Sequence, residues 1–407
     1  SPRTPTERGA LDEVSAAVSQ HPGPDPATTT SPTTAPTTPT AWAVIAGGGT
    51  AGHTLPGIAI ARALVDLGHD PDTIHFVGSE RGSEARLVPD AGFAVTLLPG
   101  RGIQRRFTLA NVSAVWGLLR GVVRAFLLMA RHRPSVVVAM GGYASVPCAL
   151  AAVVLRVPIV VAEQNAVPGL ANRLTARFAK VAAVAFAGTA LPRAVVTGNP
   201  VRPEVLAVER THDGVAARSA LHIAEDQRVL LAFGGSLGSL RINEAVVGAL
   251  DVWLPRRDLT VRHVIGDRDW AVLTEHAPTH TAEGVTYVPV RYEDDMPRAL
   301  VAADLVLCRS GATSVAELAV IGVPAILVPL PGAPGDHQTA NARALVEAGA
   351  AVLVPDAELT AARLVREVDA LLGEEGRLDA MSAAALTVAK RDAGRAVADL
   401  VEQHARG

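Results

Sequence analysis

Two stretches of the 407-residue chain share one pattern, in which a short apolar run ends in a glycine cluster and a helical pattern follows. Residues 41–46 lead into the glycines at 47–49, and residues 229–233 lead into the glycine-rich run 234–238. A short, unalternating apolar run bounded by glycines is typical of a strand that is covered on both faces. The pattern therefore predicts, twice in one chain, a buried strand that passes through a tight turn into a helix.

Further apolar runs separated by helical patterns follow each glycine cluster. They occupy residues 73–77, 135–139, 158–162 and 181–186 in the first half, and 261–265, 305–308 and 325–328 in the second. Strands that alternate with helices form a parallel, doubly wound sheet, so the chain is predicted to be α/β with two Rossmann-like domains. Pro200 and Pro203 predict a stiff, non-helical junction between residues 41–200 and 201–385. The Ala-rich stretch 379–403 is expected to be helical.

Composition excludes several classes of protein. A formal net charge of −3 argues against nucleic-acid binding, which requires an excess of basic residues. Two cysteines, Cys148 and Cys308, exclude a disulfide scaffold and the commonest zinc sites. Residues 1–40 are expected to form a disordered arm, because 15 of the 19 residues from 22 to 40 are Pro, Ser or Thr. The arm also lacks the apolar core of a signal peptide.

The segment 101–133 contains seven arginines and no acidic residue, interleaved with apolar side chains. Residues 109–129 are long enough to span a bilayer, but Arg120 and Arg124 near the middle make insertion costly. On the residues alone two interpretations remain. The segment either lies on an anionic membrane surface, or it is an amphipathic helix that packs on the sheet with its arginines in solvent.

The first glycine cluster is suited to binding a phosphate or a sugar nucleotide. Glycines let backbone N–H groups approach a ligand, and the N-terminus of the following helix favours negative charge. Residues 47–52 also match G-x-G-x-x-G, which would indicate a dinucleotide site with Glu80 as its ribose partner. His53 follows the last glycine and is a candidate general base or phosphate donor. The alternative is a histidine near a helix N-terminus without a chemical role.

The second half contains two glycine-rich strand-to-helix junctions, at residues 234–238 and 309–317. Such a pair suggests a nucleoside diphosphate held by helix N-termini, with Glu317 on the ribose hydroxyls. Ser314 and Glu317 also match a capping box, which requires no ligand. In the polar segment 332–342, Gln338 and Asn341 are suited to reading the hydroxyl and amide groups of a sugar.

No metal and no cofactor are expected. Asp267 and Asp269 form a D-x-D and Asp294 stands beside Asp295, but both pairs are interpreted as ordinary surface turns. No His or Cys cluster has the spacing of metal ligands. A leaving diphosphate would then be stabilised by helix N-termini and by Arg202 or Arg309.

Seven motifs occur in a characteristic order, at residues 48–56, 141–145, 163–165, 198–202, 234–238, 310–317 and 336–342. Together they resemble the MurG family of peptidoglycan N-acetylglucosaminyltransferases, from residue 41 to the C-terminus. The resemblance implies a GT-B fold, with an interdomain cleft and a last helix, about 386–407, that returns to the first domain. It also implies an inverting, metal-independent transfer of GlcNAc from UDP-GlcNAc to the MurNAc 4-hydroxyl of lipid I. The product would be lipid II, made by a peripheral protein at the cytoplasmic face of a bacterial cell membrane.

The resemblance assigns roles to individual residues, with His53 as the candidate base. The residues implied for UDP-GlcNAc are Thr50, Ala51, Gly52, Asn165, Arg202, Ser236, Ala312, Thr313, Glu317 and Gln338. Those implied for the lipid diphosphate are Gly48, Gly49, Gly141, Gly142 and Tyr143. A lipid acceptor also favours the membrane interpretation of segment 101–133, through Arg105, Arg106, Phe107 and Trp116. The implied partners are UDP-GlcNAc, lipid I and an anionic membrane surface, with no nucleic acid.

The chain departs from the family pattern at two places. Ala162 stands where some members have a histidine, so a histidine there is not essential in this chain. The acidic run 293–295 replaces a more apolar neighbourhood at the expected uracil site. The competing functions are a UDP-sugar epimerase on the same architecture, an NAD-dependent oxidoreductase and a non-catalytic membrane scaffold.

Overall fold

A computed structural model describes residues 41–406, apart from residues 81, 100–108, 236–237 and 275–283. In residues 109–118 it describes the backbone alone. The expected arm 1–40 and the predicted site residues Arg105, Arg106, Phe107 and Ser236 therefore lie outside the described residues, as does the side chain of Trp116.

The first sheet is parallel and follows the order β3-β2-β1-β4-β5-β6-β7. Its strands are β1 (Ala43–Gly48), β2 (Ile74–Ser79), β3 (Ala94–Leu98), β4 (Val136–Gly142), β5 (Ile159–Glu163), β6 (Val181–Val184) and β7 (Ala194–Val196). The strand order reverses between β1 and β4, and ligands of such sheets bind at the carboxyl ends of the strands beside this reversal.

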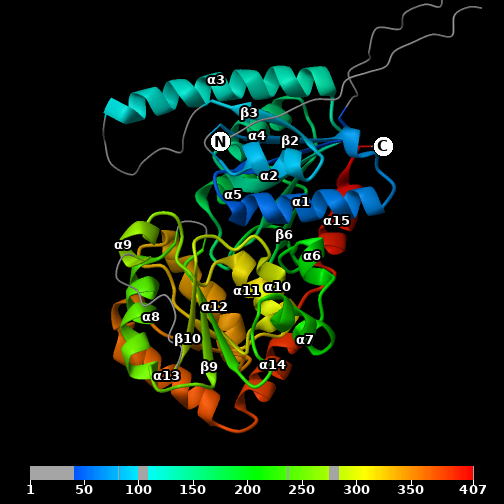
Figure 1. Cartoon of the computed structure of the whole chain (residues 1–407). Helices are drawn as coiled ribbons and strands as arrows, with labels where there is room; N and C mark the ends of the chain where they lie inside the picture. Colours follow the sequence, from blue (N-terminus) through cyan, green and yellow to red (C-terminus); the bar gives the residue numbers. More distant parts are fainter. Residues whose placement is uncertain (1–40, 81, 100–108, 236–237, 275–283, 407) are drawn as a thin grey trace, which may run out of the picture. The chain divides into compact units, whose positions relative to one another are not determined.

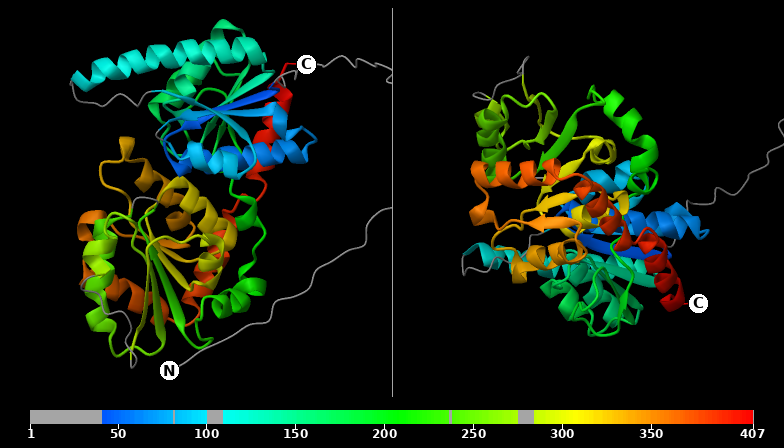
Figure 2. Two further views of the ribbon diagram at one scale, coloured as in Figure 1. Left: turned by 45° about the horizontal axis from the view of Figure 1, so that its top comes forward. Right: turned by 90° about the horizontal axis from the view of Figure 1, so that it is seen from below.

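Helices cover both faces of the first sheet (Figures 1 and 2). They are α1 (Ala51–Asp66), α2 (Glu84–Asp90), α3 (Leu109–His132), α4 (Ser145–Val154), α5 (Leu170–Thr175) and α15 (Ala393–His404). Val44 and Ala46 of β1 pack in the core cluster that includes side chains of α3 and α4. Ala43 and Ile45 pack in the cluster that includes side chains of α1 and α15. Because both faces are buried, the strand shows no apolar–polar alternation.

The second sheet is also parallel and follows the order β10-β9-β8-β11-β12-β13. Its strands are β8 (Arg228–Phe233), β9 (Leu259–Val264), β10 (Thr286–Val290), β11 (Leu305–Cys308), β12 (Ala325–Leu327) and β13 (Ala351–Leu353). The winding repeats that of the first six strands of the other sheet, with β8 and β11 in the places of β1 and β4. This arrangement confirms the prediction of two Rossmann-like sheets.

Helices also pack on both faces of the second sheet. The helices of this half are α6 (Pro203–Leu206), α7 (Arg210–Ala220), α8 (Leu240–Trp253), α9 (Trp270–Thr274), α10 (Met296–Ala302), α11 (Ala312–Ile321), α12 (His337–Glu347), α13 (Ala361–Gly373) and α14 (Arg377–Thr387). One core cluster contains side chains of α7, α10, α11 and α12. The other contains side chains of α8 and α13.

The C-terminal stretch forms two helices rather than the single helical stretch expected over 379–403. The helix α14 ends at Thr387, and α15 begins at Ala393. Met381 of α14 packs in a core cluster of the second sheet, whereas Val397 and Val401 of α15 pack in a cluster of the first. The break arises because the two helices bury their apolar faces against different sheets.

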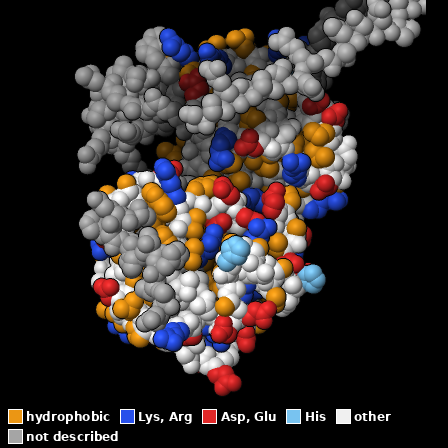
Figure 3. All heavy atoms as spheres, in the orientation of Figure 1, with side chains coloured by type: hydrophobic (Ala, Val, Ile, Leu, Met, Phe, Trp, Pro, Cys, Tyr) orange, Lys and Arg blue, Asp and Glu red, His pale blue; other side chains and the backbone are white. Residues whose placement is uncertain are grey.

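The helix α3 presents an apolar and basic outer surface. Ala125 and Met129 are buried toward the sheet, whereas Leu119, Val123 and Leu127 are exposed. In Figure 3 hydrophobic and basic side chains lie beside one another where Figure 1 places α3. Among the residues with described side chains, no helix combines the length and the apolar character that a membrane span requires.

Replacing Val401 by Asp tests the packing of α15. The Val401 side chain is fully buried in the core cluster that α15 shares with α1, so a carboxylate there has no partner. We expect the free energy of unfolding to fall by about 3 kcal/mol, measured by urea unfolding. Gln403→Asp, at an exposed position of the same helix, is the matched control. Equal stability of the two variants would contradict the packing described above.

Candidate functional site

The first glycine loop connects β1 to α1 and leaves the start of the helix open. Thr50 is the N-cap residue of α1 and makes no side-chain capping hydrogen bond. Ala51, Gly52 and His53 form the first turn of the helix. The N-terminal N–H groups of a helix have no intrahelical partner, so this turn presents free donors beside the sheet reversal.

His53 is half-buried at the start of α1. Its Nδ1 lies 3.4 Å from the Thr50 hydroxyl oxygen. Burial lowers the pKa of His53 below the usual value of an imidazole, the carboxylates of Glu163 and Glu84 oppose this shift, and His337 adds to it. His53 is therefore neutral near pH 7 and able to accept a proton, as a general base must.

The second loop of this sheet, after β4, packs backbone to backbone against the first. Gly142 has φ of +78°, and a Cβ atom there would overlap the carbonyl oxygen of Gly48. Tyr143 donates its hydroxyl to the Pro99 carbonyl at 2.8 Å, and burial raises the pKa of this phenol. The two loops therefore lie together, but the donor of Tyr143 is engaged within the protein.

A third loop follows β5 and is organised by Glu163, which is buried. Glu163 Oε1 accepts hydrogen bonds from the backbone N–H and the side-chain amide of Asn165, at 2.9 and 3.2 Å. Its Oε2 accepts from the Gly169 N–H and from Asn172 Nδ2, at 3.1 and 3.0 Å. These four bonds fix the position of Asn165, one of the predicted donor-site residues.

On the second sheet, α11 begins at a strand end with an open N-terminus. Its N-cap residue is Gly311, which has no side chain, and Ala312 and Thr313 form its first turn. The hydroxyl oxygens of Ser310 and Thr313 are buried without a hydrogen-bond partner among the described residues. This junction therefore has unused donors and acceptors, as a ligand site requires.

Glu317 pairs with Arg202 instead of forming the capping box that its spacing from Ser314 suggested. Ser314 lies inside α11, since Gly311 is the N-cap residue. Glu317 Oε1 accepts from Nε and Nη2 of Arg202 at 3.0 and 2.9 Å. Burial raises the pKa of Glu317, and Arg202 opposes that shift. Arg202 and Glu317, which are 115 positions apart in the sequence, are thus joined by an ion pair in the second half.

Asn341 and Gln338 are both held by hydrogen bonds. Asn341 is fully buried; its Nδ2 donates to Asn165 Oδ1 at 3.2 Å, and its Oδ1 accepts from the Ala166 N–H at 2.8 Å. Gln338 Oε1 accepts from the Leu330 N–H at 2.9 Å. The structure therefore brings together Asn165 and Asn341, which the sequence placed in separate motifs.

Arg309, considered above for the leaving diphosphate, is engaged within the protein. Its Nη1 lies 2.6 Å from Asp356 Oδ1, and its Nη2 donates to the Ser239 hydroxyl at 2.7 Å. The same Ser239 caps α8. Arg309 therefore ties β11 to the loop after β13 and to the start of α8.

The two carboxylate pairs considered for a metal are held by arginines and amides. Asp267 is exposed beside Arg291, but Asp269 is buried and accepts from Asn243 Nδ2 at 3.0 Å, so only Asp267 fits a surface turn. Asp295 caps α10. Within residues 41–406, gaps aside, no group of three or more His, Cys, Asp or Glu side chains is placed to hold a metal ion.

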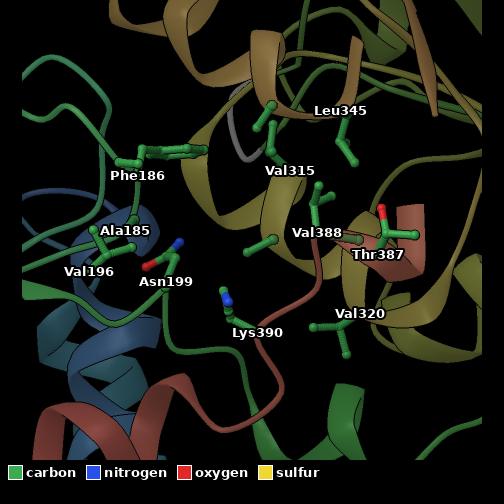
Figure 4. A pocket seen from close by; sticks show the side chains of 15 residues that line it. Ala185, Phe186, Val196, Asn199, Val315, Val320, Leu345, Thr387, Val388 and Lys390 are labelled. Atoms are coloured by element: carbon green, nitrogen blue, oxygen red, sulfur yellow. The ribbon is translucent and has the colours of Figure 1, made fainter. Parts of the chain in front are cut away.

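A separate cavity of about 390 Å³ lies where the chain crosses between the two sheets (Figure 4). It is lined mainly by apolar side chains, among them Phe186, Val315 and Val388, with Asn199 and Lys390 as polar members. None of the predicted site residues lines it. The candidate site therefore consists of the loops at the strand ends and not of this cavity.

Glu84 is a site residue that the sequence did not reveal. It is buried beneath the first glycine loop, where its Oε1 accepts from the Gly49 N–H at 2.9 Å and from the Thr54 hydroxyl at 2.8 Å. It lies in the polar run after β2, and no spacing rule connects it with the glycines. Only the adjacency of β1 and β2 in the sheet could have indicated the contact.

The sequence matches known protein families and relatives along most of its length. Residues 43–184 match the glycosyltransferase family 28 N-terminal domain, and residues 229–400 match the glycosyltransferase family 28 C-terminal domain. A curated relative from Nocardioides sp. is 43% identical over 360 residues, which cover 88% of this chain and 96% of the relative. It is named UDP-N-acetylglucosamine–N-acetylmuramyl-(pentapeptide) pyrophosphoryl-undecaprenol N-acetylglucosamine transferase.

Two solved structures are also similar. The crystal structure of MurG from Acinetobacter baumannii is 30% identical, with a TM-score of 0.69 over 89% of this chain and 99% of that one. UDP-GlcNAc 2-epimerase from Neisseria meningitidis shares the fold at 12% identity, with a TM-score of 0.60 over 89% and 99% of the two chains.

Replacing Glu163 by Ala tests the organisation of the third loop. The change removes the acceptor of four hydrogen bonds, so we expect the free energy of unfolding to fall by about 3 kcal/mol. Glu163→Gln keeps part of the acceptor capacity, so its free energy of unfolding should lie between those of the wild type and Glu163→Ala. Glu204→Ala, at an exposed position, is the control, and urea unfolding is the measurement. A change in Glu163→Ala within about 0.5 kcal/mol of the control would contradict this account of the loop.

Proposed function

The chain belongs to glycosyltransferase family 28 and to its peptidoglycan N-acetylglucosaminyltransferases, and we propose from this premise the reaction that it catalyses. It transfers GlcNAc from UDP-GlcNAc to the 4-hydroxyl of the N-acetylmuramyl group of lipid I, giving lipid II. The observation that carries the proposal is the relative named for this transfer, which matches 88% of the chain at 43% identity. The glycine loops at both sheet reversals support it.

UDP-GlcNAc binds at the second sheet, where α11 begins. Glu317 Oε1 is occupied by Arg202, while Oε2 has no hydrogen-bond partner among the described residues. Arg202 thus orients a carboxylate whose second oxygen is free to accept from the ribose hydroxyls. The open N-terminus of α11 and the unpartnered Thr313 hydroxyl face the same ligand, with Gln338 as a further contact.

The acceptor hydroxyl is activated at the first sheet by His53. His53 takes the proton of the acceptor's 4-hydroxyl group while the oxygen of that hydroxyl forms a bond to C1 of GlcNAc. The bond between C1 and the phosphate oxygen breaks at the same time, and UDP leaves with the electron pair. A single displacement of this kind inverts the configuration at C1. His53 becomes an imidazolium, and the carboxylates of Glu163 and Glu84 favour that charge.

The leaving diphosphate is stabilised without a metal ion. Arg309 is paired with Asp356 and Arg202 with Glu317, so much of their charge is already compensated. The helix N-termini at α1 and α11 lack side-chain caps, and each provides about half a positive charge as well as free N–H donors. In a site that excludes water such fixed donors stabilise developing negative charge effectively.

A membrane-facing surface lies on α3, α4 and α5 of the first half, and we refer to it as the α3–α5 surface. Its exposed apolar side chains are Leu119, Val123, Phe126, Leu127, Leu150, Val153, Val154, Leu170, Leu174 and Phe178. Exposed basic residues stand among them, including Arg120, Arg124, Arg173 and Arg177. Apolar side chains interspersed with arginines are suited to an anionic lipid surface. We propose that the protein lies on the cytoplasmic face of the membrane by this surface, as a lipid-linked acceptor requires.

A transfer assay tests the reaction and its metal independence. Radiolabelled UDP-GlcNAc is incubated with a lipid I analogue, and the label in the lipid fraction is measured with and without a chelator of divalent cations. We expect label in the lipid in both cases. Absence of label would contradict the transfer, and conversion of UDP-GlcNAc without an acceptor would favour an epimerase. Loss of transfer with the chelator alone would contradict only the metal-free mechanism.

Leu127→Glu tests the α3–α5 surface, because it places a negative charge on an exposed apolar position of α3. We expect binding to phosphatidylglycerol vesicles, measured by sedimentation, to weaken about tenfold, while UDP binding is unchanged. Val215→Glu, at an equally exposed position on α7, is the matched control. The double change of Arg105 and Arg106 to Glu should also release the protein from these vesicles. Unchanged vesicle binding of both Leu127→Glu and the double variant of Arg105 and Arg106 would show that the protein contacts the membrane through another surface.

A further inference from the structure

The carboxylate of Glu84 is buried below the first glycine loop and has no assigned role. Only 3% of the residue is exposed. Its Oε1 accepts from the Gly49 N–H and the Thr54 hydroxyl, and its Oε2 lies 3.5 Å from the Ser79 N–H. Thr54 has one hydroxyl proton, which the carboxylate at 2.8 Å attracts most strongly, and the Ser83 hydroxyl at 2.8 Å can then donate to Thr54.

Glycines from three segments make room for this side chain. A Cβ atom on Gly48 would come within 2.8 Å of the Glu84 carboxyl carbon, and one on Gly78 within 2.6 Å of the Glu84 Cβ. A Cβ atom on Gly82 would overlap Glu84 Oε2. Glycines around the first loop therefore make room for the buried carboxylate of Glu84 as well as for a ligand.

The described residues give Glu84 hydrogen-bond donors but no ion-pair partner. None of their Arg, Lys or His side chains lies within 4.0 Å of the Glu84 carboxylate. Burying a carboxylate without a counter-ion is tolerated only where donors reach its oxygens, as those of Gly49, Thr54 and Ser79 do here. Among the described residues the charge of Glu84 is therefore held by hydrogen bonds alone.

His53 is the group on which the charge of Glu84 acts. Its loop is held by Glu84 at Gly49, and Thr54, the next residue in α1, donates to the same carboxylate. The charged or titratable groups that act on His53 are Glu163 after β5, Glu84 at the start of α2 and His337 at the start of α12. The two carboxylates favour the imidazolium, and His337 opposes it.

We propose that Glu84 is a positioning residue for the transfer, which fixes the loop that carries His53 and compensates the positive charge that His53 acquires. The inference rests on the proposed function, because it requires His53 to take a proton. The contact between Glu84 and Gly49 also changes which groups are expected to bind the acceptor. The Gly49 N–H is engaged by Glu84, so the lipid diphosphate must bind to other donors of this loop.

Glu84→Gln separates charge from hydrogen bonding, because an amide oxygen can still accept from Gly49 and Thr54. Without the carboxylate the pKa of His53 falls further, so the acid limb of the kcat/KM profile against pH should move to lower pH. A weaker base should also lower kcat at least about tenfold, a part of the roughly 10²- to 10⁴-fold that a general base contributes. UDP affinity and the KM for UDP-GlcNAc should not change.

Two further variants and one control complete the design. Thr54→Val keeps the charge and removes one hydrogen bond, so kcat should fall while the acid limb stays in place. Glu84→Asp restores the charge on a shorter side chain and should restore the position of the acid limb. Asp90→Asn, an exposed carboxylate of the same helix α2, is the matched control and should behave like the wild type.

Combination with His53→Ala shows whether Glu84 acts through His53. In that background Glu84→Gln should lower kcat less than about twofold, since the group it acts on is gone. Full additivity, or a folded Glu84→Gln protein with wild-type kcat and pH profile, would overturn the inference while leaving the transfer itself intact. If Glu84→Gln does not fold, a wild-type kcat in Thr54→Val together with an acid limb in Glu84→Asp that moves away from its wild-type position overturns it. A wild-type protein that transfers no GlcNAc overturns both proposals.

Discussion

The loops of the candidate site depend on carboxylates buried at their bases. Glu84 holds the first glycine loop at Gly49, and Glu163 holds the loop of Asn165. In the second half Glu317 fixes Arg202, and Asp356 pairs with Arg309. A buried carboxylate is tolerated only when donors surround it, so each of these groups imposes one arrangement on the backbone or guanidinium that it contacts. These acids thus hold loops whose glycines alone would leave the backbone free to adopt other conformations.

The pairing of carboxylates with arginines also determines where positive charge is available to bind a diphosphate. Arg202 and Arg309 are the two arginines that the sequence offered, and both are engaged by carboxylates. Side chains of Ser239, Asp295 and Thr360 cap α8, α10 and α13, which removes donors from those helices. The helices α1 and α11 have no such caps, and both begin beside a sheet reversal. Free donors therefore remain where the two glycine-rich junctions meet the strands.

Sequence patterns predicted the fold well where burial is strong. The central strands of both sheets are buried on both faces, and their unalternating apolar runs were recognised for that reason. The strands β3, β7, β10 and β13 were missed because most of their side chains are half-buried or exposed. The break between α14 and α15 was missed because the Ala-rich composition is helical throughout, and only packing against two different sheets interrupts it.

The candidate site was predictable where chemistry follows a strand end, and not where it depends on contacts between distant segments. The glycine loops and His53 follow predicted strands directly, whereas Asn165 was indicated by the resemblance to a known family. The capping box was wrong because α11 begins at Ala312, which places Ser314 inside the helix, and Glu317 pairs instead with Arg202, far away in sequence. Glu84 left no signal, since an acidic residue at the start of a short helix is ordinary unless the neighbouring strand is known.

Two sheets of the same winding thus place different groups at their strand ends, and the reaction gives a reason for the difference. In the proposed transfer an acceptor hydroxyl loses its proton to a base that becomes a cation, and at the first sheet the carboxylates of Glu84 and Glu163 favour a positive charge on His53. A sugar nucleotide must release an anion, and the second sheet presents the open N-terminus of α11 beside Arg202. A formal net charge of −3 conceals this separation. The charge relevant to catalysis is the charge within a few ångströms of each reacting group, because water and neighbouring ions screen the rest.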